Sequence, residues 1–194
     1  MRTIHDIHGG IHPPERKELS QPGQLSDAPL PAHLVLPLRQ HLGVPAAPCV
    51  AVGDTVLGGQ QIAEAQGPMS VPVHAPTSGS VVAIESRPIA HASGLEDHCI
   101  VLETDGQDQW VSCEGTADWR AEDPVTLVER VKDAGIAGMG GAGFPTAVKL
   151  TPGPTRNIET VLINGTECEP YITADDTLMQ CHADELVEGA QILA

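Results

Sequence analysis

The sequence predicts an α+β chain in two parts, a β-rich sandwich followed by the start of an α/β region. Three observations predict this. Short apolar runs separated by turns that contain Gly, Asp and Ser fill residues 33–113. Apolar residues at helical spacing begin only near residue 124. Gly (20) and Pro (17) are abundant, which favours short strands and tight turns. We therefore expect an extended arm, a sandwich, a connector and an incomplete α/β domain over residues 1–32, 33–113, 114–123 and 124–194.

The charge balance limits the classes of partner. The 194 residues include 10 basic and 26 acidic side chains, giving a net charge of −16. Such a chain repels phosphate backbones, and one Phe and one Tyr provide no aromatic platform for bases, so we expect no nucleic-acid partner. No apolar run reaches the ~18 residues of a bilayer-spanning helix, so no direct membrane span is expected.

Cysteine and histidine spacing predicts no metal site. The five cysteines are scattered, form no C-x-x-C pair and are expected to be reduced thiols. His5, His8 and His12 lie in the arm and suggest either a metal site or exposed side chains. Their spacing fits no known metal-site pattern, which favours exposed side chains.

Two segments of the sandwich region have a recognisable pattern. Val52–Val56 with Gly58–Gln60 reads VGDxVxxGQ, and Ala75–Val81 reads APxSGxV. Both resemble the half-motifs of biotinyl and lipoyl domains, which implies a barrel-sandwich hybrid fold. A carrier domain needs a Lys on its exposed turn, but the turn here is Pro76–Gly79 and no Lys lies between Lys17 and Lys132. The architecture is therefore expected without the carrier function.

Helical signals begin after the connector. Asp123 can cap a helix whose first residue is Pro124, and Gly135 can end it. The apolar run Thr160–Asn164 is expected to be a buried strand. Thr173 and Asp176 have the spacing of a capping box and open a final helix. Its apolar face predicts an unpaired surface that could join two copies, and its pattern continues to the last residue, so we expect a longer protein. The face consists of Met179, Ala183, Leu186, Val187, Ala190 and Leu193.

The segment from Gly138 to Gly143 is the most informative motif. It satisfies G-x-G-x-x-G, but a helix precedes it where a dinucleotide fold needs a strand, so we reject a standard Rossmann site. Its glycines leave no side chains between the backbone and a phosphate or flat ring. A flexible connector between helices is the alternative, although Phe144–Pro145 within the run has little use in a linker.

The motifs together are similar to known redox subunits. GMGGAGFPTAVKL resembles the flavin loop of the NADH-binding subunit of respiratory complex I, and INGTECEPY resembles its second flavin and nucleotide segment. The C subunit of Rnf-type (Rsx-type) electron transport complexes is more similar still. That resemblance includes GGIHPPERK, PLRQHLG, VPVHAPTSG and ECEPYITADD, and extends over nearly the whole chain from Gly9.

The resemblance implies a set of cofactor-binding residues. The glycine loop would lie against FMN, Phe144 would stack near the nicotinamide, and Lys149 would meet flavin phosphate or ring oxygens. Asn164 matches a flavin-contacting Asn, while Glu167 and Glu169 match residues that meet flavin or nucleotide hydroxyls. Glu169 is the better candidate for a ribose. The complete set is Gly138, Gly140, Gly141, Gly143, Phe144, Lys149, Asn164, Glu167 and Glu169.

The resemblance also implies a function. The full-length protein would bind FMN and NAD(H) and pass electrons between nicotinamide nucleotide and two [4Fe–4S] clusters located C-terminal to this chain. It would be a peripheral subunit on the cytoplasmic side of the inner membrane, with the other Rnf subunits as partners. Hydride transfer between the two cofactors requires no side-chain acid or base, so we name no catalytic residue. The chain alone is expected to bind FMN weakly or not at all, and not to oxidise NADH.

Two alternatives remain. A related flavin subunit, such as the cobalamin-reducing protein of propanediol-utilising microcompartments, shares the glycine loop and the sandwich. A non-catalytic assembly module would dock onto membrane partners through the sandwich, with the glycine loop serving only the architecture.

Overall fold

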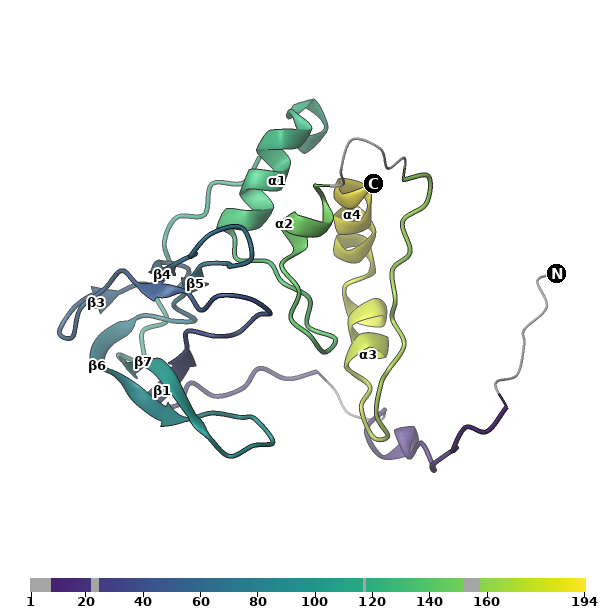
Figure 1. The fold of residues 1–194 in the computed structure, drawn as a ribbon, viewed down its shortest axis with the longest axis horizontal. Coiled ribbons are helices and arrows are strands. Elements are labelled where there is room, and N and C mark those ends of the chain that lie inside the picture. Colours follow the sequence, from purple (N-terminus) through teal and green to yellow (C-terminus); the bar gives the residue numbers. More distant parts are fainter. Residues whose placement is uncertain (1–7, 22–24, 117, 152–157) are drawn as a thin grey trace. The chain divides into compact units, whose positions relative to one another are not determined.

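The computed structural model describes residues 8–21, 25–116, 118–151 and 158–194. The chain divides into two compact units. The first, called the sandwich unit below, is Ala28–Glu159, and the second, called the terminal unit, combines Met1–Asp27 with Thr160–Ala194. Figure 1 shows the strands gathered in the sandwich unit, together with the helices of both units.

Two antiparallel sheets form the sandwich, as the alternation of short apolar runs and turns predicts. The four-stranded sheet has the order β1-β7-β6-β3 and the three-stranded sheet the order β2-β4-β5. Of the apolar run Pro48–Val52, only Pro48 lies in a strand. The strands are β1 (His33–Pro37), β2 (Ala47–Pro48), β3 (Thr55–Val56), β4 (Gln61–Glu64), β5 (Val73–His74), β6 (Gly79–Pro88) and β7 (Glu96–Thr104).

An aliphatic core holds the two sheets together. Ile62 and Val56 are each 1% exposed, and Ile100 and Leu102 of β7 are fully buried. These side chains come from strands of both sheets and form one cluster. Removing such aliphatic surface from water stabilises the fold by roughly 25 cal/mol per Å². This cluster is built from aliphatic side chains, in agreement with the low aromatic content.

The Pro76–Gly79 turn is closed rather than presented to solvent. Thr77 and Ser78 are 1% and 0% exposed. The Thr77 hydroxyl donates to Asp108 at 2.7 Å, and the Ser78 hydroxyl donates to Asp105 at 2.7 Å. Hydrogen bonds from the Gln107 backbone N–H and from Ser78 lower the pKa of the Asp105 carboxyl. Thr77, Ser78 and Gly79 are therefore part of the packed structure, and Pro76 is the exposed residue of the turn.

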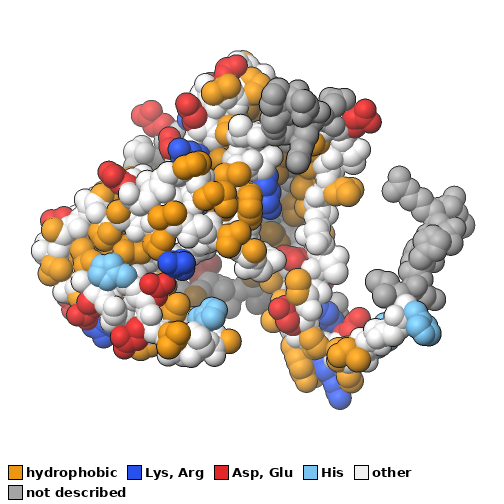
Figure 2. All heavy atoms as spheres, in the orientation of Figure 1, with side chains coloured by type: hydrophobic (Ala, Val, Ile, Leu, Met, Phe, Trp, Pro, Cys, Tyr) orange, Lys and Arg blue, Asp and Glu red, His pale blue; other side chains and the backbone are white. Residues whose placement is uncertain are grey.

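Helices follow the connector at the expected place. α1 (Pro124–Asp133) begins where Asp123 accepts a hydrogen bond from the Val125 N–H at 3.0 Å, and Gly135 ends the helical segment with φ +71°. α2 (Thr146–Lys149) is a single turn directly after the glycine loop. Figure 2 shows acidic side chains spread over the surface, with few basic ones among them.

The prediction of a buried strand at Thr160–Asn164 is wrong. The segment has no strand pairing among the described residues, and Leu162 and Ile163 are 87% and 51% exposed. A strand needs a hydrogen-bonded neighbour, and apolar alternation alone does not supply one. Figure 1 shows this segment as an extended stretch that leads into the turn before α3.

The final helix differs from the prediction in two ways. It is divided at His182 (φ −130°, ψ 38°) into α3 (Ala174–Cys181) and α4 (Ala183–Leu193). Thr173 makes no side-chain capping bond, so the expected capping box is absent. The Glu167 carboxylate accepts the backbone N–H groups of Asp175 and Asp176 instead, at 2.8 and 3.1 Å. A carboxylate from a preceding turn therefore caps α3.

The described part of the N-terminal arm is attached to the C-terminal segment. Lys17 donates to the backbone oxygens of Glu169 and Ile172 at 3.1 and 2.7 Å, and the Tyr171 N–H donates to the Glu15 oxygen at 2.8 Å. His5 lies outside the described residues. Within the described ranges, none of the helices has both the length and the hydropathy needed to cross a bilayer.

Candidate functional site

The glycine loop is the tip of a small hairpin in the sandwich unit. The Gly138 N–H donates to the Phe144 oxygen at 2.9 Å, and the Thr146 N–H donates to the Ile136 oxygen at 3.0 Å. Between these bonds, Met139 is 96% exposed, and Gly140 and Ala142 are also exposed. The loop therefore presents its backbone to solvent while its base is held by hydrogen bonds.

The glycines in the loop have different reasons to lack a side chain. A Cβ added at Gly140 or Gly141 would meet no atom within 4 Å. Gly140 has no left-handed φ, whereas Gly141 has φ +120°, which disfavours other residues. Gly143 combines φ +60° with a Cβ position only 3.1 Å from the Gln40 oxygen. Packing thus explains Gly143, but nothing in the fold requires Gly140.

A cation and an aromatic ring lie beside this backbone. The Lys149 Nζ is 5.5 Å from the centroid of the Phe144 ring, and 3.9 Å from the position that a Cβ on Gly138 would take. Phe144 follows the loop directly, and α2 carries Lys149 at its last position. The structure therefore brings together the predicted residues of the glycine loop with Phe144 and Lys149.

The remaining predicted residues belong to the terminal unit, and each has a different environment. The Asn164 oxygen accepts the Thr166 N–H at 2.9 Å, which closes a local turn. Glu167 is partly buried and caps α3. Glu169 is exposed, and no hydrogen bond involves its carboxylate among the described residues. The structure thus presents the predicted site as two groups of residues in separate units.

Sequence reasoning missed Lys17 as a neighbour of the acidic turn. This cation lines a cavity of about 200 Å³ with Glu15, Glu167 and Glu169. Lys17 is more than 150 residues from Glu169 along the chain. No local pattern could have joined them, because the contact depends on tertiary structure.

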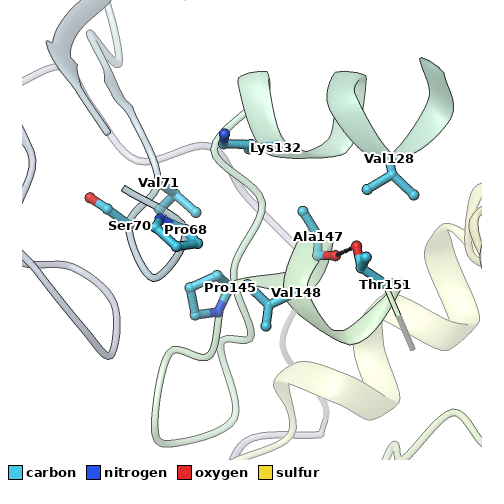
Figure 3. Close-up of a pocket in the computed structure, with 9 residues that line it drawn as sticks. All are labelled: Pro68, Ser70, Val71, Val128, Lys132, Pro145, Ala147, Val148 and Thr151. Carbon is cyan, nitrogen blue, oxygen red and sulfur yellow. Dashed lines mark hydrogen bonds between the residues drawn. The ribbon is translucent and has the colours of Figure 1, made fainter. Parts of the chain in front are cut away.

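Two larger cavities lie in the sandwich unit. The first, about 380 Å³, is mostly apolar and lies between the β4–β5 loop, α1 and α2 (Figure 3). No predicted cofactor residue lines it. The second, about 500 Å³, is lined by His41, His74 and the Gly135–Met139 segment. Burial lowers the pKa of the His74 imidazole. This second cavity therefore lies between the base of the glycine loop and the sandwich residues His41 and His74.

Comparison with known proteins now identifies the family. Residues 5–107, which make up 103 of the 194 residues, match the sequence model described as the RnfC barrel sandwich hybrid domain. The chain belongs to the RnfC family. Residues 131–194 match a second model, described as the Nuo51 FMN-binding domain. The expected fold class, a barrel-sandwich hybrid followed by the beginning of a flavin-binding domain, is confirmed, and so is the resemblance to the RnfC family.

Individual RnfC relatives agree along nearly the whole chain. This chain is 52% identical to the C subunit of the ion-translocating oxidoreductase complex of Serratia proteamaculans over 190 residues. The matched region covers 98% of this chain and 27% of that protein. The protein of the same name from Pseudomonas aeruginosa is 49% identical over 193 residues, covering 100% of this chain and 25% of its own length. The chain therefore spans about a quarter of these curated relatives.

The glycine loop fits the FMN that the second family model implies. Gly140 and Gly141 leave the space beside the backbone open, so a flat ring or a phosphate could lie against it. Lys149 places a positive charge near Gly138 at the start of the loop, where an anionic group is favoured. An exposed glycine backbone with a cation near its start is thus compatible with a flavin phosphate or ring.

Proposed function

We propose that this chain supplies the flavin platform of a peripheral subunit in an ion-translocating electron transport complex. The complete protein binds FMN and NAD(H) and passes electrons between nicotinamide nucleotide and iron–sulfur clusters. Its partners in the complex couple this transfer to ion translocation. The relatives are named as C subunits of an ion-translocating oxidoreductase complex, which supports both the complex and the redox class.

One observation carries the proposal, namely the open backbone of the Gly138–Gly143 loop beside Lys149. A connector between helices would have no need for a residue such as Gly140, where ordinary side chains fit without strain. A ligand platform does need it, because any side chain would keep the ligand away from the backbone. Glycine at Gly140 is therefore explained by a ligand and left unexplained by the fold.

Each residue beside the loop has a definite role in this proposal. FMN, when bound, supplies the hydride and electron chemistry. Lys149 binds its anionic phosphate or stabilises negative charge on its ring, and Phe144 offers an apolar face that excludes water beside the nicotinamide. None of these roles needs a proton donor, so we assign no catalytic side chain.

The acidic turn supplies the second group of contacts. Glu169 keeps its carboxylate exposed, and carboxylates accept hydrogen bonds from ribose hydroxyls. Glu167 is less suited to this role, since its carboxylate already accepts two backbone N–H groups at the start of α3. We therefore assign nucleotide recognition to Glu169, flavin contact to Asn164, and support of the turn to Glu167.

The remaining parts of the proposal concern the longer protein. Two [4Fe–4S] clusters lie in the portion that this chain does not include, and the protein sits peripherally on the cytoplasmic side of the inner membrane. Because the chain spans about a quarter of its relatives, we expect it to bind FMN weakly when prepared alone and to show no NADH oxidation.

The test is substitution of Gly140 in the protein prepared at the full length of its relatives. Gly140→Val should reduce the flavin absorbance bands of the purified protein severalfold, because the new side chain fills the ligand space without disturbing the fold. Gly115→Val is the matched control, since Gly115 also has open space around it and no left-handed φ.

The result separates the flavin proposal from the assembly module. If Gly140→Val and Gly115→Val retain as much FMN as the unmodified protein, the loop is architectural and the proposed function fails. Equal loss of FMN in both variants would also contradict a specific platform, since Gly115 lies in the connector far along the chain from the loop.

A further inference from the structure

The sandwich holds both ends of the glycine loop. At its start, Gly135 packs so closely that an added Cβ would lie 2.7 Å from the Pro72 oxygen and 3.4 Å from the His74 Nδ1. At its end, the Leu42 N–H donates to the Gly143 oxygen at 2.8 Å. Backbone groups of the sandwich therefore determine where the loop begins and ends.

The 40–42 segment fits tightly against the end of the loop. A Cβ on Gly143 would be 3.1 Å from both the Gln40 oxygen and the His41 Cα. At this separation even a methyl group would force one of the two backbones to move. The position of the 40–42 backbone is thus transmitted directly to Gly143.

His41 fixes that segment inside the sandwich. Only 6% of its surface is exposed. Its Nε2 lies 3.0 Å from the Val44 oxygen and 3.3 Å from the Val71 nitrogen, so the ring bridges two separate loops. A second bond from the Val44 N–H to the Met69 oxygen, at 2.9 Å, joins the same two loops.

The buried His41 ring leaves hydrogen-bonding capacity unsatisfied, which lowers the stability of the fold and indicates a role other than stability. A neutral Nε2 either donates to the Val44 oxygen or accepts from the Val71 N–H, and cannot do both. The Nδ1 atom is buried and has no partner among the described residues. Buried nitrogens without partners are rare and destabilising, and each needs an explanation.

We propose that His41 is a positioning residue for the flavin loop. Through the Gln40–Leu42 backbone it holds Gly143, and through Gly143 it sets the conformation in which the Gly138–Gly143 backbone meets FMN. The proposal rests on the proposed function. It also gives the sandwich a role, because a fold with no carrier Lys and a closed turn serves here as the rigid support of a binding loop.

The test uses His41→Ala and His41→Gln in the full-length protein, with FMN affinity, flavin midpoint potential and amide exchange as readouts. His41→Ala should weaken FMN binding about tenfold, because the loop is no longer pre-organised. It should also shift the potential and speed exchange of the Gly138 and Thr146 amides, whose bonds close the hairpin. His41→Gln should restore these properties, since its amide can donate to the Val44 oxygen.

Val81→Ala is the matched control. Val81 is 1% exposed in the aliphatic core, and its N–H donates to the Asp54 oxygen, away from the 40–44 and 69–74 loops. It should lower the stability of the sandwich without changing the potential or the Gly138 exchange. Should His41→Ala fail to fold, Gly143→Ala tests the same contact from the loop side, with the same expected weakening.

The outcomes distinguish the positioning role from the proposed function. The positioning role is overturned if His41→Ala binds flavin as well as the unmodified protein does and the Gly138 amide exchanges at an unchanged rate. The proposed function would then remain intact. An unmodified protein that binds no FMN would overturn the proposed function itself. Equal effects of Val81→Ala and His41→Ala would reduce His41 to a core residue.

Discussion

The carboxylate of Glu167 shows how a residue within a binding motif can serve the fold. It lies between two exposed neighbours in the Glu-Cys-Glu turn, yet it accepts two N–H groups from the first turn of α3. The four N–H groups at a helix start have no partner within the helix, so a nearby carboxylate stabilises it. Thr173 had the sequence pattern for this task, and Glu167 performs it.

Replacing Glu167 should therefore loosen α3. In Glu167→Ala, we expect the amides of Asp175 and Asp176 to exchange about fivefold faster, which corresponds to the loss of ~1 kcal/mol of capping energy. Amide exchange followed by mass spectrometry measures this. Glu169→Ala is the control, and should leave these amides unchanged while weakening NADH binding. Identical exchange in the two variants would show that Glu167 does not cap the helix.

The contacts of Lys17 and His41 were out of reach of sequence reasoning. Both lie in segments that resemble the family, GGIHPPERK and PLRQHLG, but neither segment suggests a contact for them. Lys17 bonds to Glu169 and Ile172, and His41 meets Val71, all far along the chain. By contrast, Lys149 was predictable through the resemblance of its segment to a flavin loop. The structure places it near Phe144, at 5.5 Å from the ring centroid.

Among the elements, β6 and β7 form the longest pair of strands in the sandwich. Its strands are antiparallel along most of their length, and the loop after β7 folds over the Pro76–Gly79 turn at the start of β6. Asp105 joins the two ends of this pair through hydrogen bonds from Ser78 and the Gln107 N–H. The ends of the two strands are thus joined by a carboxylate, and both hydrogen bonds favour its ionised form.

This closure predicts a pH dependence of the sandwich. Because hydrogen bonds lower the pKa of Asp105 in the folded state, the unfolded state binds more protons in the acid range. The contribution of Asp105 is present above the ordinary Asp pKa of about 3.9 and is lost as the pH falls through the lower folded value. Asp105→Asn should be less stable than the unmodified protein at pH 7.

Urea unfolding at two pH values measures this prediction. The difference in midpoint between Asp105→Asn and the unmodified protein should be present near neutral pH and should shrink well below the ordinary Asp pKa. Ser78→Ala should reproduce part of the loss at neutral pH, whereas Ser80→Ala should not, since no hydrogen bond involves the Ser80 hydroxyl among the described residues. A midpoint difference that is independent of pH would contradict the assignment.

The strand prediction is correct in the sandwich and wrong at Thr160–Asn164 for one physical reason. Strands of the sandwich were predictable because turn residues separate them and each finds a neighbour. Thr160–Asn164 has the same apolar character without a neighbour among the described residues, and remains exposed. Local pattern determines whether a segment can be a strand, and pairing determines whether it is one.

Taken as a whole, the molecule has one well-buried core. All buried side chains among the described residues lie between Leu38 and Ala147, and the described residues of the terminal unit include none. Of the predicted apolar face, Val187 of α4 is 53% exposed and Met179 of α3 is 41% exposed. The predicted apolar face is therefore only partly covered among the described residues.

We expect this face to pair two copies when the chain is prepared alone. Light scattering at high protein concentration should give the mass of a dimer, and Val187→Glu should return it to the monomer because a charge would be buried in the interface. Asp184→Gln, on the polar side of α4, should leave the dimer intact. A monomer mass for the unmodified chain at high concentration would contradict this expectation.

Much of this protein can be predicted from local chemistry alone. Turn residues mark the strands of the sandwich, Asp123 and Gly135 mark the ends of the helical segment at α1, and the absence of Lys from residues 18–131 excludes a carrier. These features depend on neighbours in sequence. The cap of α3, the closed turn and the anchoring of the glycine loop depend on hydrogen bonds of Glu167, Asp105 and His41 to Asp175, Ser78 and Val71, which lie 8, 27 and 30 residues away. Only folding brings those partners within hydrogen-bond distance, because such contacts follow from packing of the whole chain and leave no local pattern.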